Sequence, residues 1–426
     1  MPSSRTKDSP YRAVVTTTRF AAVGAVAVAA WYDSFRVVPR PPVHGFFDLR
    51  VYRGAVLWWL ADRPLYSFHL GRTHYGFTYP PFAAVVMTPL AWLTSEQATW
   101  LTMCGSALIV VVIIGRLVWP VARRHGWSPW FTVAVAVPVV FAMDPIRETL
   151  GYGQVNAVIF ALVLSDVVAL RRGWAWAGVG VGLATALKLT PGPFIVLLVL
   201  VGRRRAAAVA TGTFLGATLL GFVVDATASR QYWTTELWDT SRVGRLDKPS
   251  NQSVLGMLAR LAEPGEPDRR LWLVLAGAVL VVGMWRAVRA YRRGDDLVAV
   301  TLVGLTSCLV SPITWTHHLY WVVPALVVLL DVAAGSPGRR LRAGAVRAGV
   351  LAVVVTVPLV LSVPWYFPLE PGTPPTSASV ELLGRSSFTC LLLALMVLLP
   401  TRRVSSAEPS AVQRTAPPRP GGWSPR

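Results

Sequence analysis

Long apolar stretches recur along nearly the whole chain and alternate with short polar segments. A helix needs about 20 apolar residues to cross a bilayer, and somewhat fewer where aromatic or basic residues anchor its ends. About twelve stretches are candidates, with soft boundaries, at approximately 13–32, 98–119, 129–143, 154–170, 174–189, 192–202, 206–224, 271–289, 297–312, 317–333, 345–365 and 386–400. The pattern predicts an all-α polytopic membrane protein with about 12 transmembrane helices.

Composition agrees with this prediction and removes the soluble classes. The chain has 426 residues, of which 54% are hydrophobic and only 15% are charged, and its mean hydropathy is +0.50. A soluble chain of this length needs more charged surface. A formal net charge of +20 would suggest nucleic acid in a soluble protein. Here the arginines stand in short clusters between apolar stretches, so we expect contact with anionic membrane lipids and no nucleic-acid partner.

The arginine clusters predict the orientation of the chain. With twelve crossings, all of them fall on one side, and the positive-inside rule makes that side cytoplasmic, together with both termini. The clusters are Arg123 and Arg124, Arg171 and Arg172, Arg203 to Arg205, Arg292 and Arg293, Arg339 with Arg340 and Arg342, and Arg402 with Arg403. The stretch at 13–32 also has features of a signal peptide, but no clear small-residue cleavage site follows it. We therefore interpret it as a retained helix of a plasma-membrane protein.

This topology requires that Phe82–Leu93 does not cross the membrane. The stretch has about 12 residues, follows Pro80 and Pro81, and contains Pro89, which favours a short interfacial or re-entrant helix. Residues 33–97 then form a long extracytoplasmic segment, in which 57-LWWL-60 is typical of a helix lying at the membrane surface. A second external segment covers 225–270. We expect one membrane domain at 1–403 and a disordered cytoplasmic tail at 404–426, which is rich in Pro, Ser and Arg.

Polar residues gather at the outer ends of the predicted spans, where they are costly unless they cap a helix or serve a function. Asp48 is a lone carboxylate after Phe46 and Phe47, and Tyr52 and Arg53 follow it on a nearby turn. The residues alone leave two interpretations of Asp48 open, a helix N-cap and a catalytic base.

Lys188 and a pair of histidines share this outer side. Lys188 stands where a short helix breaks at 190-TPGP-193, so its ammonium must either bind an anion such as phosphate or extend to the interface. His317 and His318 are adjacent, so on a helix they point about 100° apart and cannot both face one metal ion, which disfavours a metal site. Either histidine suits a hydrogen bond to a phosphate or a sugar, or a bond that only satisfies the ring.

Amide side chains form another candidate group. Gln154 and Asn156 begin a span after two glycines, where amides read sugar hydroxyls or bond a neighbouring helix. Asn251 and Gln252 lie in 249-PSNQS-253, which also matches an N-glycosylation pattern that is common by chance. Tyr79 belongs to the turn 79-YPPF-82.

Several cofactor classes have no signature in the sequence. The three cysteines, Cys104, Cys308 and Cys390, have neither disulfide nor zinc spacing, and no nucleotide-binding glycine motif occurs. We expect neither a metal nor another cofactor.

Taken in this order, the motifs resemble the glycosyltransferase family 87 mannosyltransferases. These are membrane enzymes of the GT-C superfamily that use polyprenyl-phosphate-mannose, known from actinobacterial phosphatidylinositol mannoside and lipomannan synthesis. The resemblance covers about residues 40–325 and rests on five ordered motifs. They are the Asp-containing segment that ends in Tyr-Pro-Pro, Gly-Gln-x-Asn, Leu-Lys-Leu-Thr-Pro, Asn-Gln-Ser, and Ser-Pro followed by Trp-x-His-His.

The resemblance implies roles for these residues. The family's external-loop aspartate is a general base, which maps onto Asp48 in its Asp-x-x-Val-Tyr context. Lys188, His317 and His318 would lie near the donor phosphate. The remaining substrate-binding candidates, without individual roles, are Tyr52, Tyr79, Gln154, Asn156, Asn251 and Gln252.

The implied reaction transfers mannose from the lipid phosphate to a glycolipid or lipoglycan acceptor, with inversion to an α-1,2 linkage on the extracytoplasmic face. The sugar phosphate carries its own leaving group, so no nucleotide site is needed. Two alternatives stay open at this point: a GT-C transferase with another lipid-linked sugar such as arabinofuranose, and a lipid-linked sugar flippase or transporter. Transporters usually have broken helices in corresponding halves and polar groups near the midplane.

Overall fold

A computed structural model describes residues 45–263, 265–335, 343–367 and 378–402, with isolated helical positions between 18 and 29. Within these ranges the chain is helical and forms no strand beyond one isolated bridge between Asn251 and Trp315. The predicted first span, the arginines at 339–342 and the predicted tail lie outside the described residues, apart from those isolated positions. The all-α prediction is confirmed for the part that the structure describes.

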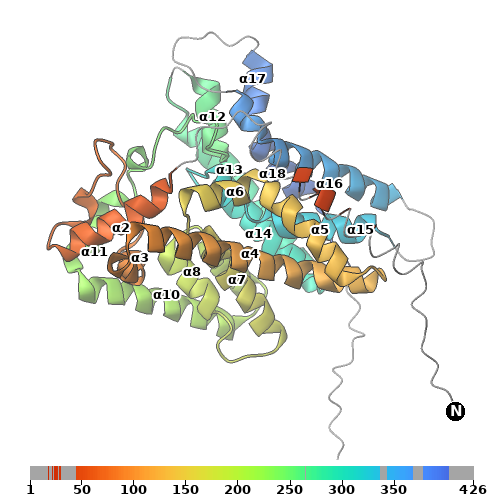
Figure 1. Ribbon diagram of the computed structural model, residues 1–426, viewed down its shortest axis with the longest axis horizontal. Coiled ribbons are helices and arrows are strands. Elements are labelled where there is room, and N and C mark those ends of the chain that lie inside the picture. Colours follow the sequence, from red (N-terminus) through yellow and green to blue (C-terminus); the bar gives the residue numbers. More distant parts are fainter. Residues whose placement is uncertain are drawn as a thin grey trace, which may run out of the picture.

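The helices of the first half run from the external segment to the middle of the chain. They are α2 (Phe47–Leu60), η2 (Leu65–Ser67), α3 (Pro81–Met87), η3 (Thr88–Trp92), α4 (Ser95–Arg124), α5 (Pro129–Ala142), α6 (Asp144–Tyr152), α7 (Asn156–Arg171), α8 (Val179–Leu187), α9 (Gly192–Leu200) and α10 (Arg204–Val224). Figure 1 shows α4 and α10 running along the long axis of the molecule, with α2, α3 and α11 gathered at one end of them.

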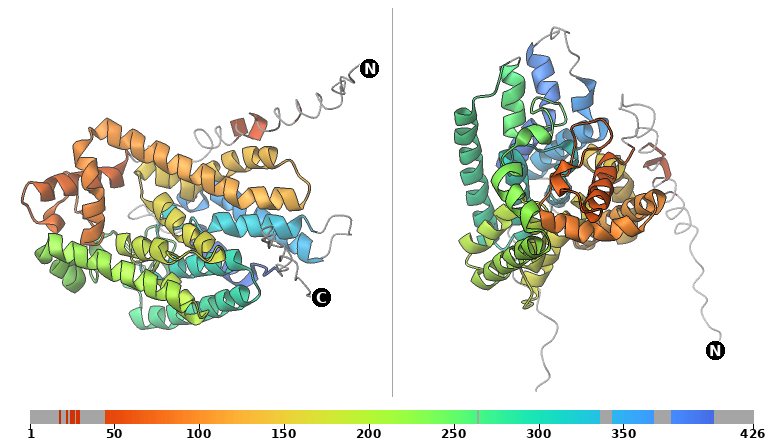
Figure 2. Two further views of the ribbon diagram at one scale, coloured as in Figure 1. Left: turned by 90° about the horizontal axis from the view of Figure 1, so that it is seen from below. Right: turned by 90° about the vertical axis from the view of Figure 1, so that its left-hand side faces the viewer.

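The second half contributes the second external segment and the remaining long helices. Its elements are α11 (Ala226–Gln231), η4 (Tyr232–Glu236), η5 (Thr240–Arg242), α12 (Val254–Ala262), α13 (Arg269–Arg292), α14 (Asp296–Val310), η6 (Thr316–His318), α15 (Val322–Ala333), α16 (Ala343–Leu361), η7 (Val363–Tyr366), α17 (Ala378–Arg385) and α18 (Ser387–Leu398). In the view from below, α4 and α10 run along opposite sides of the bundle, with other helices between them (Figure 2).

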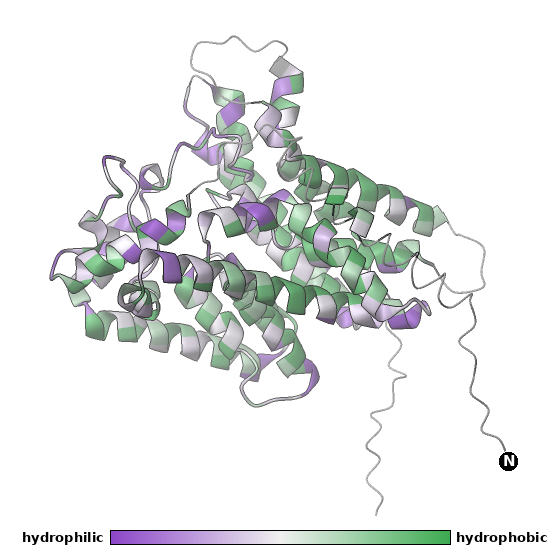
Figure 3. Cartoon of the chain, viewed as in Figure 1, coloured by the Kyte–Doolittle hydropathy of each residue, from purple (hydrophilic) through white to green (hydrophobic). Residues whose placement is uncertain are grey.

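The long helices carry apolar side chains on their outer faces. On α16, Val346, Val350, Val353 and Val357 are all exposed at helical spacing. An exposed apolar face this long is unfavourable in water and favourable against lipid tails. Figure 3 shows the same separation across the molecule, with hydrophobic colour along the long helices and hydrophilic colour mainly at loops and helix ends.

Fewer of the described helices are long and apolar enough to cross a membrane than the sequence pattern predicts. Among the described residues, α4, α10, α13 and α16 are long and apolar enough to cross a membrane. Two further spans result if α5 with α6, and α17 with α18, are each one bent span. Two predicted spans are too long: 174–189 is helical only over α8, and within 317–333 the α-helix begins only at Val322, after the short η6. The twelve-span count stays a prediction.

A buried carboxylate explains why α8 begins late. Asp166 on α7 accepts a hydrogen bond of 2.7 Å from the backbone N–H of Val181 in the first turn of α8. A negative charge at a helix N-terminus stabilises the free amides there. Gly178 precedes the helix with a φ of 110°, and residues 174–178 form turns. The helix then ends at Leu187, nine residues later.

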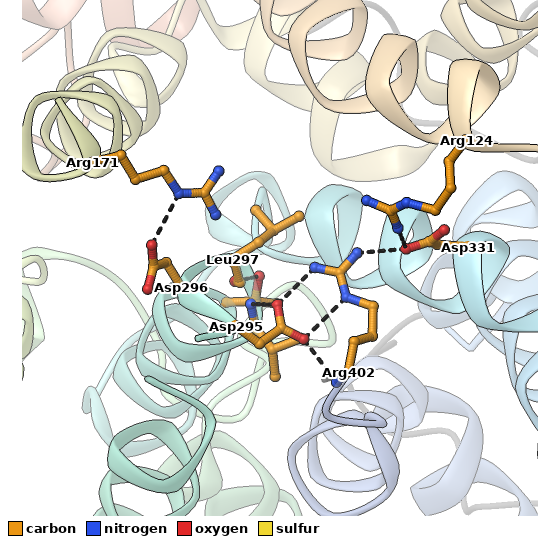
Figure 4. A network of polar contacts seen from close by, with 9 residues as sticks. Arg124, Arg171, Asp295, Asp296, Leu297, Asp331 and Arg402 are labelled. Carbon is orange, nitrogen blue, oxygen red and sulfur yellow. Dashed lines mark hydrogen bonds and ion pairs between the residues drawn. The ribbon is translucent and has the colours of Figure 1, made fainter. Parts of the chain in front are cut away.

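The described arginine clusters gather at one end of the bundle. Arg402 forms ion pairs with Asp295 and Asp331, and Arg124 pairs with the same Asp331. Arg171 pairs with Asp296 at the start of α14 (Figure 4). Arg293 at the end of α13 donates to Thr401 beside this network. Since these groups come from α4, α7, α13, α14, α15 and α18, the predicted gathering of the clusters holds for the residues described.

The opposite end carries the two segments that the sequence predicts to be external. Arg53 of α2 donates to the carbonyl of Leu93 just before α4, and Trp59 donates to Asp225 at the end of α10. The stretch Phe82–Leu93 forms α3 and η3, whose twelve residues extend about 18–20 Å and fall short of a 30 Å hydrocarbon core. This agrees with a helix that does not cross.

Candidate active site

A cavity of about 540 Å³ opens at this second end. Such a volume lies within the usual range for small-molecule sites. Seven parts of the chain enclose it: α2, the segment 75–80, the junction of α6 and α7, the break between α8 and α9, the segment 232–250, the segment 311–318 and Trp365 of η7. Seven of the ten candidate site residues line it: Asp48, Tyr52, Tyr79, Gln154, Lys188, His317 and His318.

Asp48 lies in the first turn of α2 and is not the N-cap. The N-cap position belongs to Phe46, which has a φ of 53° and forms no side-chain cap. The N-cap interpretation is therefore wrong, because the helix begins one residue before the carboxylate. The backbone N–H of Phe46 bonds the carbonyl of Gly151 at 3.1 Å, which joins the start of α2 to the end of α6.

A glycine brings the amide of Gln154 to this carboxylate. Gly153 ends α6 with a φ of 68°, and a Cβ there would lie 2.7 Å from the Cβ of Leu49. Only glycine fits both the left-handed backbone and the close approach of α2. The next residue, Gln154, donates from Nε2 to Oδ2 of Asp48 at 2.6 Å. The amide thus orients the carboxyl group of Asp48.

Two tyrosines hold Gln154 in turn. The hydroxyl of Tyr79 donates to Oε1 of Gln154 at 3.1 Å, and it lies 2.9 Å from the hydroxyl of Tyr52. Burial, reinforced by the charge of Asp48, raises the pKa of Tyr79 well above its ordinary value, and burial does the same to the pKa of Tyr52. Both phenols therefore keep their protons at neutral pH. The chain Tyr52–Tyr79–Gln154–Asp48 is a hydrogen-bonded positioning network.

Lys188 reaches the cavity from the predicted helix break. Its backbone is extended between α8 and α9, and Ser307 of α14 bonds the carbonyl of Thr190 in the same break. The ammonium donates to Oδ1 of Asn156 at 3.2 Å and stands 5.4 Å from the centre of the Tyr79 ring. Among the described residues no carboxylate lies within ion-pair distance of it. Its hydrogen-bond partners are thus neutral groups, and the charge of Asp48 acts on it only from beyond ion-pair distance.

The ring of His318 faces the same ammonium. Nε2 lies 2.8 Å from Nζ of Lys188, while Nδ1 accepts the backbone N–H of Trp315 at 3.2 Å. Because Nδ1 accepts a hydrogen bond, a neutral imidazole carries its proton on Nε2. Two donors then meet between Lys188 and His318, which is unfavourable unless one loses its proton. An anion that enters here accepts a hydrogen bond from both.

The carbonyl of His317 is fixed from below. It accepts from Nδ2 of Asn156 at 2.8 Å and from Thr149 at 3.1 Å. The planes of the two imidazole rings stand at 84° to one another, and the ring of His317 packs against Tyr152. Asn156 itself does not line the cavity. Its amide contacts the ammonium of Lys188 and the backbone of η6 behind the cavity wall.

Asn251 and Gln252 do not line the cavity. Both residues are 0% exposed. Oδ1 of Asn251 accepts the N–H of Thr314 at 2.9 Å, and its amide nitrogen donates to carbonyls at 246 and 312. Gln252 bonds Thr389 of α18 and two backbone carbonyls, at 249 and 385. These amides brace the loop against the segment 311–318, so direct substrate contact, which the sequence suggested, has no support from their positions.

Other lining residues were not singled out from the sequence. They include the aromatic residues Tyr75, Tyr152, Trp315 and Trp365, and the cations Arg242 and Lys248. Aromatic rings in a polar cavity are suited to the apolar faces of sugars. Their signal in the sequence was the aromatic content of the external segments, which does not distinguish rings that face a cavity from rings at a membrane surface.

No group of three or more His, Cys, Asp or Glu that could hold a metal ion occurs in the described ranges. The expectation of a reaction without metal stays a prediction.

Comparison with known proteins gives consistent matches. The profile of "Glycosyltransferase family 87" matches residues 77–312. A Mycobacterium tuberculosis protein named polyprenol-phosphate-mannose-dependent alpha-(1-2)-phosphatidylinositol mannoside mannosyltransferase is 34% identical over 318 residues, which cover 71% of this chain and 74% of that protein. The Mycolicibacterium smegmatis protein of the same name is 35% identical over 350 residues, 77% of this chain and 78% of its own length.

A second kind of relative carries a different acceptor in its name. The Mycobacterium tuberculosis polyprenol-phosphate-mannose-dependent alpha-(1-2)-phosphatidylinositol pentamannoside mannosyltransferase is 35% identical over 294 residues, 68% of this chain and 64% of that protein. No solved structure gives a significant match.

Proposed function

Because this chain belongs to glycosyltransferase family 87, we propose that it transfers mannose from polyprenyl-phosphate-mannose to a phosphatidylinositol mannoside, forming an α-1,2 linkage. One feature of the cavity carries the proposal for this chain. A carboxylate, Asp48, and a cation without an ion-pair partner in the described ranges, Lys188, both line it. Tyr79 connects them, because its hydroxyl bonds the Gln154 that holds Asp48 and its ring lies 5.4 Å from the ammonium of Lys188. A base and an anion site are what this transfer needs.

Asp48 acts as the general base. Its carboxylate takes the proton from an acceptor hydroxyl as that oxygen attacks the anomeric carbon of the donor mannose. The bond from the anomeric carbon to the phosphate oxygen breaks on the opposite face, and the electron pair leaves with polyprenyl phosphate. Attack from the opposite face inverts a β-linked sugar to an α-linkage. A positioned base typically contributes 10² to 10⁴-fold.

Lys188 and the Nε2–H of His318 receive the leaving phosphate. Both are donors that meet without an acceptor between them, and negative charge grows on the phosphate as the glycosidic bond breaks. Donors fixed in advance stabilise such charge more than mobile water does. Asn156 holds the ammonium from the far side and keeps it in the cavity.

The extracytoplasmic face is part of the proposal. The cavity and the described arginine clusters lie at opposite ends of the bundle, and the positive-inside rule assigns the arginine end to the cytoplasm. A lipid phosphate sugar supports this face, because it brings its own leaving group to a compartment without nucleotide sugars. The reaction then requires no metal and no nucleotide.

The alternatives carry less support. A flippase is not favoured, because the chain belongs to a transferase family and its polar residues face one end of the bundle. A donor with a different sugar, such as arabinofuranose, is disfavoured by the names of the relatives and not by any contact in the cavity.

A transfer assay with purified protein in detergent tests the proposal. We expect radiolabelled mannose to pass from polyprenyl-phosphate-mannose to phosphatidylinositol mannosides, and the product to be cleaved by an α-1,2-mannosidase. Transfer from polyprenyl-phosphate-arabinofuranose but not from the mannosyl lipid would replace the donor. Transfer of neither sugar, with movement of labelled lipid across vesicle bilayers, would favour the flippase.

A further inference from the structure

A second cation lines the cavity on the loop between η5 and α12. Nζ of Lys248 donates to the hydroxyl of Tyr75 at 2.8 Å and stands 5.4 Å from the centre of that ring. Tyr75 in turn packs edge-on against Phe47, the neighbour of Asp48, with ring centres 5.5 Å apart. Lys248 therefore stands near the catalytic helix, on a different part of the chain from Lys188.

The charge of Lys248 is not neutralised by its own segment. Glu236 pairs with Arg242 and also accepts from Gln231. Asp239 accepts from the backbone and the hydroxyl of Ser241.

The third carboxylate of this loop, Asp247, bonds Arg245 through two contacts. None of the described carboxylates forms an ion pair with Lys248. A phenol is a weak partner for an ammonium, so an anion in the cavity would bind it better.

The turn that carries Lys248 is held rigidly by a buried guanidinium. Arg260 of α12 donates to the carbonyl of Lys248 at 3.0 Å and to that of Asn251 at 2.8 Å, and it bonds Ser386 at the start of α18. The carbonyl of Lys248 also accepts the N–H of Asn251. A buried guanidinium that donates hydrogen bonds to the carbonyls of one turn fixes that turn before any ligand binds.

This arrangement explains the motif 249-PSNQS-253, which does not itself reach the cavity through its amides. Gly256 lets α12 close against this turn, because a Cβ there would lie 2.6 Å from the carbonyl oxygen of Asn251. Of the motif, Ser250 lines the cavity beside Lys248. The buried amides thus serve to present Lys248 and Ser250.

We infer that Lys248, with the hydroxyls of Tyr75 and Ser250, forms a second anion subsite that binds the phosphodiester of the acceptor glycolipid. The inference rests on the proposed function, in which both substrates are lipid phosphates. Two anions then enter one cavity, and two cations without carboxylate partners line it from separate elements. Lys188, beside His318, serves the donor phosphate, and Lys248 selects an anionic acceptor.

Kinetics of Lys248→Gln test the subsite. Loss of a hydrogen bond to a charged group corresponds to about a 10- to 100-fold change. We expect the KM for a phosphatidylinositol mannoside to rise by that factor, with the KM for polyprenyl-phosphate-mannose unchanged. The KM for an uncharged alkyl mannoside acceptor should not change in the variant. Lys248→Arg should retain part of the preference for the anionic acceptor.

Arg230→Gln is the matched control, because it removes one positive charge from an exposed position of the same external segment outside the cavity. An unchanged KM for the anionic acceptor in Lys248→Gln would refute the subsite. A rise in the KM for the donor instead would show that Lys248 binds the donor phosphate. An equal rise in the KM for the uncharged acceptor would show a general distortion of the cavity. Either result would also refute the subsite.

Direct binding separates this inference from the proposed function. Quenching of tryptophan fluorescence by the anionic acceptor needs no transfer. Binding that depends on Lys248 in a protein that transfers no mannose would keep the subsite and refute the proposed function. Mannose transfer by the wild type, with acceptor binding that does not depend on Lys248, would keep the proposed function and refute the subsite.

Discussion

Asp48 has the features of a held base, since Gln154 fixes one carboxylate oxygen and the cavity lies before it. We predict that Asp48→Asn binds both substrates but loses about 10² to 10⁴-fold in kcat, because an amide cannot take the proton. Single-turnover kinetics with the purified variant measure this. Asp62→Asn is the control: Asp62 is exposed on the same segment with a φ of 58°, which asparagine tolerates. A variant at position 48 with near-normal kcat would contradict the assignment.

Gln154 is a positioning residue, and a substitution that places a negative charge at this position tests that role. Gln154→Glu sets a second carboxyl group beside Asp48, and two carboxylates this close hold a shared proton to higher pH. The base works only when it is deprotonated, so activity is lost as pH falls. We therefore predict that the acid limb of the pH–rate profile moves to higher pH. Gln97→Glu, at an exposed helix cap, should leave the profile unchanged. A purely structural role would lower kcat at every pH without moving that limb.

Lys188 and His318 should act on the donor. We predict that Lys188→Ala and His318→Ala each raise the apparent KM for polyprenyl-phosphate-mannose or lower kcat by about 10-fold or more, while the acceptor KM stays constant. Donor titration at saturating acceptor measures this, and unchanged thermal unfolding in detergent shows that the fold is kept. Normal donor kinetics in both variants would remove these residues from the site.

At the scale of elements, the break between α8 and α9 matters most for the site. If the helix continued through Lys188, its regular rotation would set the direction of this side chain. The extended backbone at Lys188 instead lets the ammonium reach Asn156 and His318. The prolines and the glycine at 190–193 predict the break. They do not predict that Ser307 of α14 bonds the carbonyl of Thr190 and so holds the break in place.

The short helices α3 and η3 decide the orientation of everything that follows. Because they are too short to cross a hydrocarbon core, we predict that the start of α4 lies on the extracytoplasmic side together with the cavity. We predict that a cysteine at Ser95 or Glu96, both exposed, is labelled by an impermeant maleimide added outside intact cells. The background must lack Cys104, Cys308 and Cys390. Arg205→Cys, in an arginine cluster, should be labelled only after permeabilisation. The opposite pattern would reverse the topology.

At the scale of the molecule, the end opposite the cavity is closed by the network of Figure 4. The side chain of Asp295 is 0% exposed and that of Asp331 is 4% exposed, and Arg402 pairs with both. The arginines that orient the chain are thus also bound to carboxylates of α14 and α15, which the positive-inside rule does not predict.

Arg402→Met leaves Asp295 buried without an ion-pair partner among the described residues. Breaking one side of a buried pair costs about 3–5 kcal/mol. We predict a clear loss of stability, measured as the midpoint of thermal unfolding in detergent, with donor and acceptor KM values unchanged in the folded fraction. Arg292→Met removes the same charge from an exposed position at the same end and should unfold at the wild-type temperature. Equal midpoints for the two variants would contradict a stabilising network.

Periodicity and local chemistry are enough to determine several features of this protein. Apolar stretches long enough to meet lipid determine the helical class, and clustered arginines determine that one end of the bundle differs from the other. The polar motifs determine most of the cavity, because a polar side chain at the end of an apolar helix is costly without a partner. Family membership follows from the same motifs.

Only the tertiary structure decided which motif residues face the cavity. Asn251 and Gln252 look like ligand-binding amides in sequence, yet they donate hydrogen bonds to backbone carbonyls far along the chain. Lys248 carries no motif of its own and reaches the cavity because the buried Arg260 fixes its turn. Hydrogen-bond partners and burial depend on contacts between distant segments, and neither local pattern nor helical period encodes these contacts.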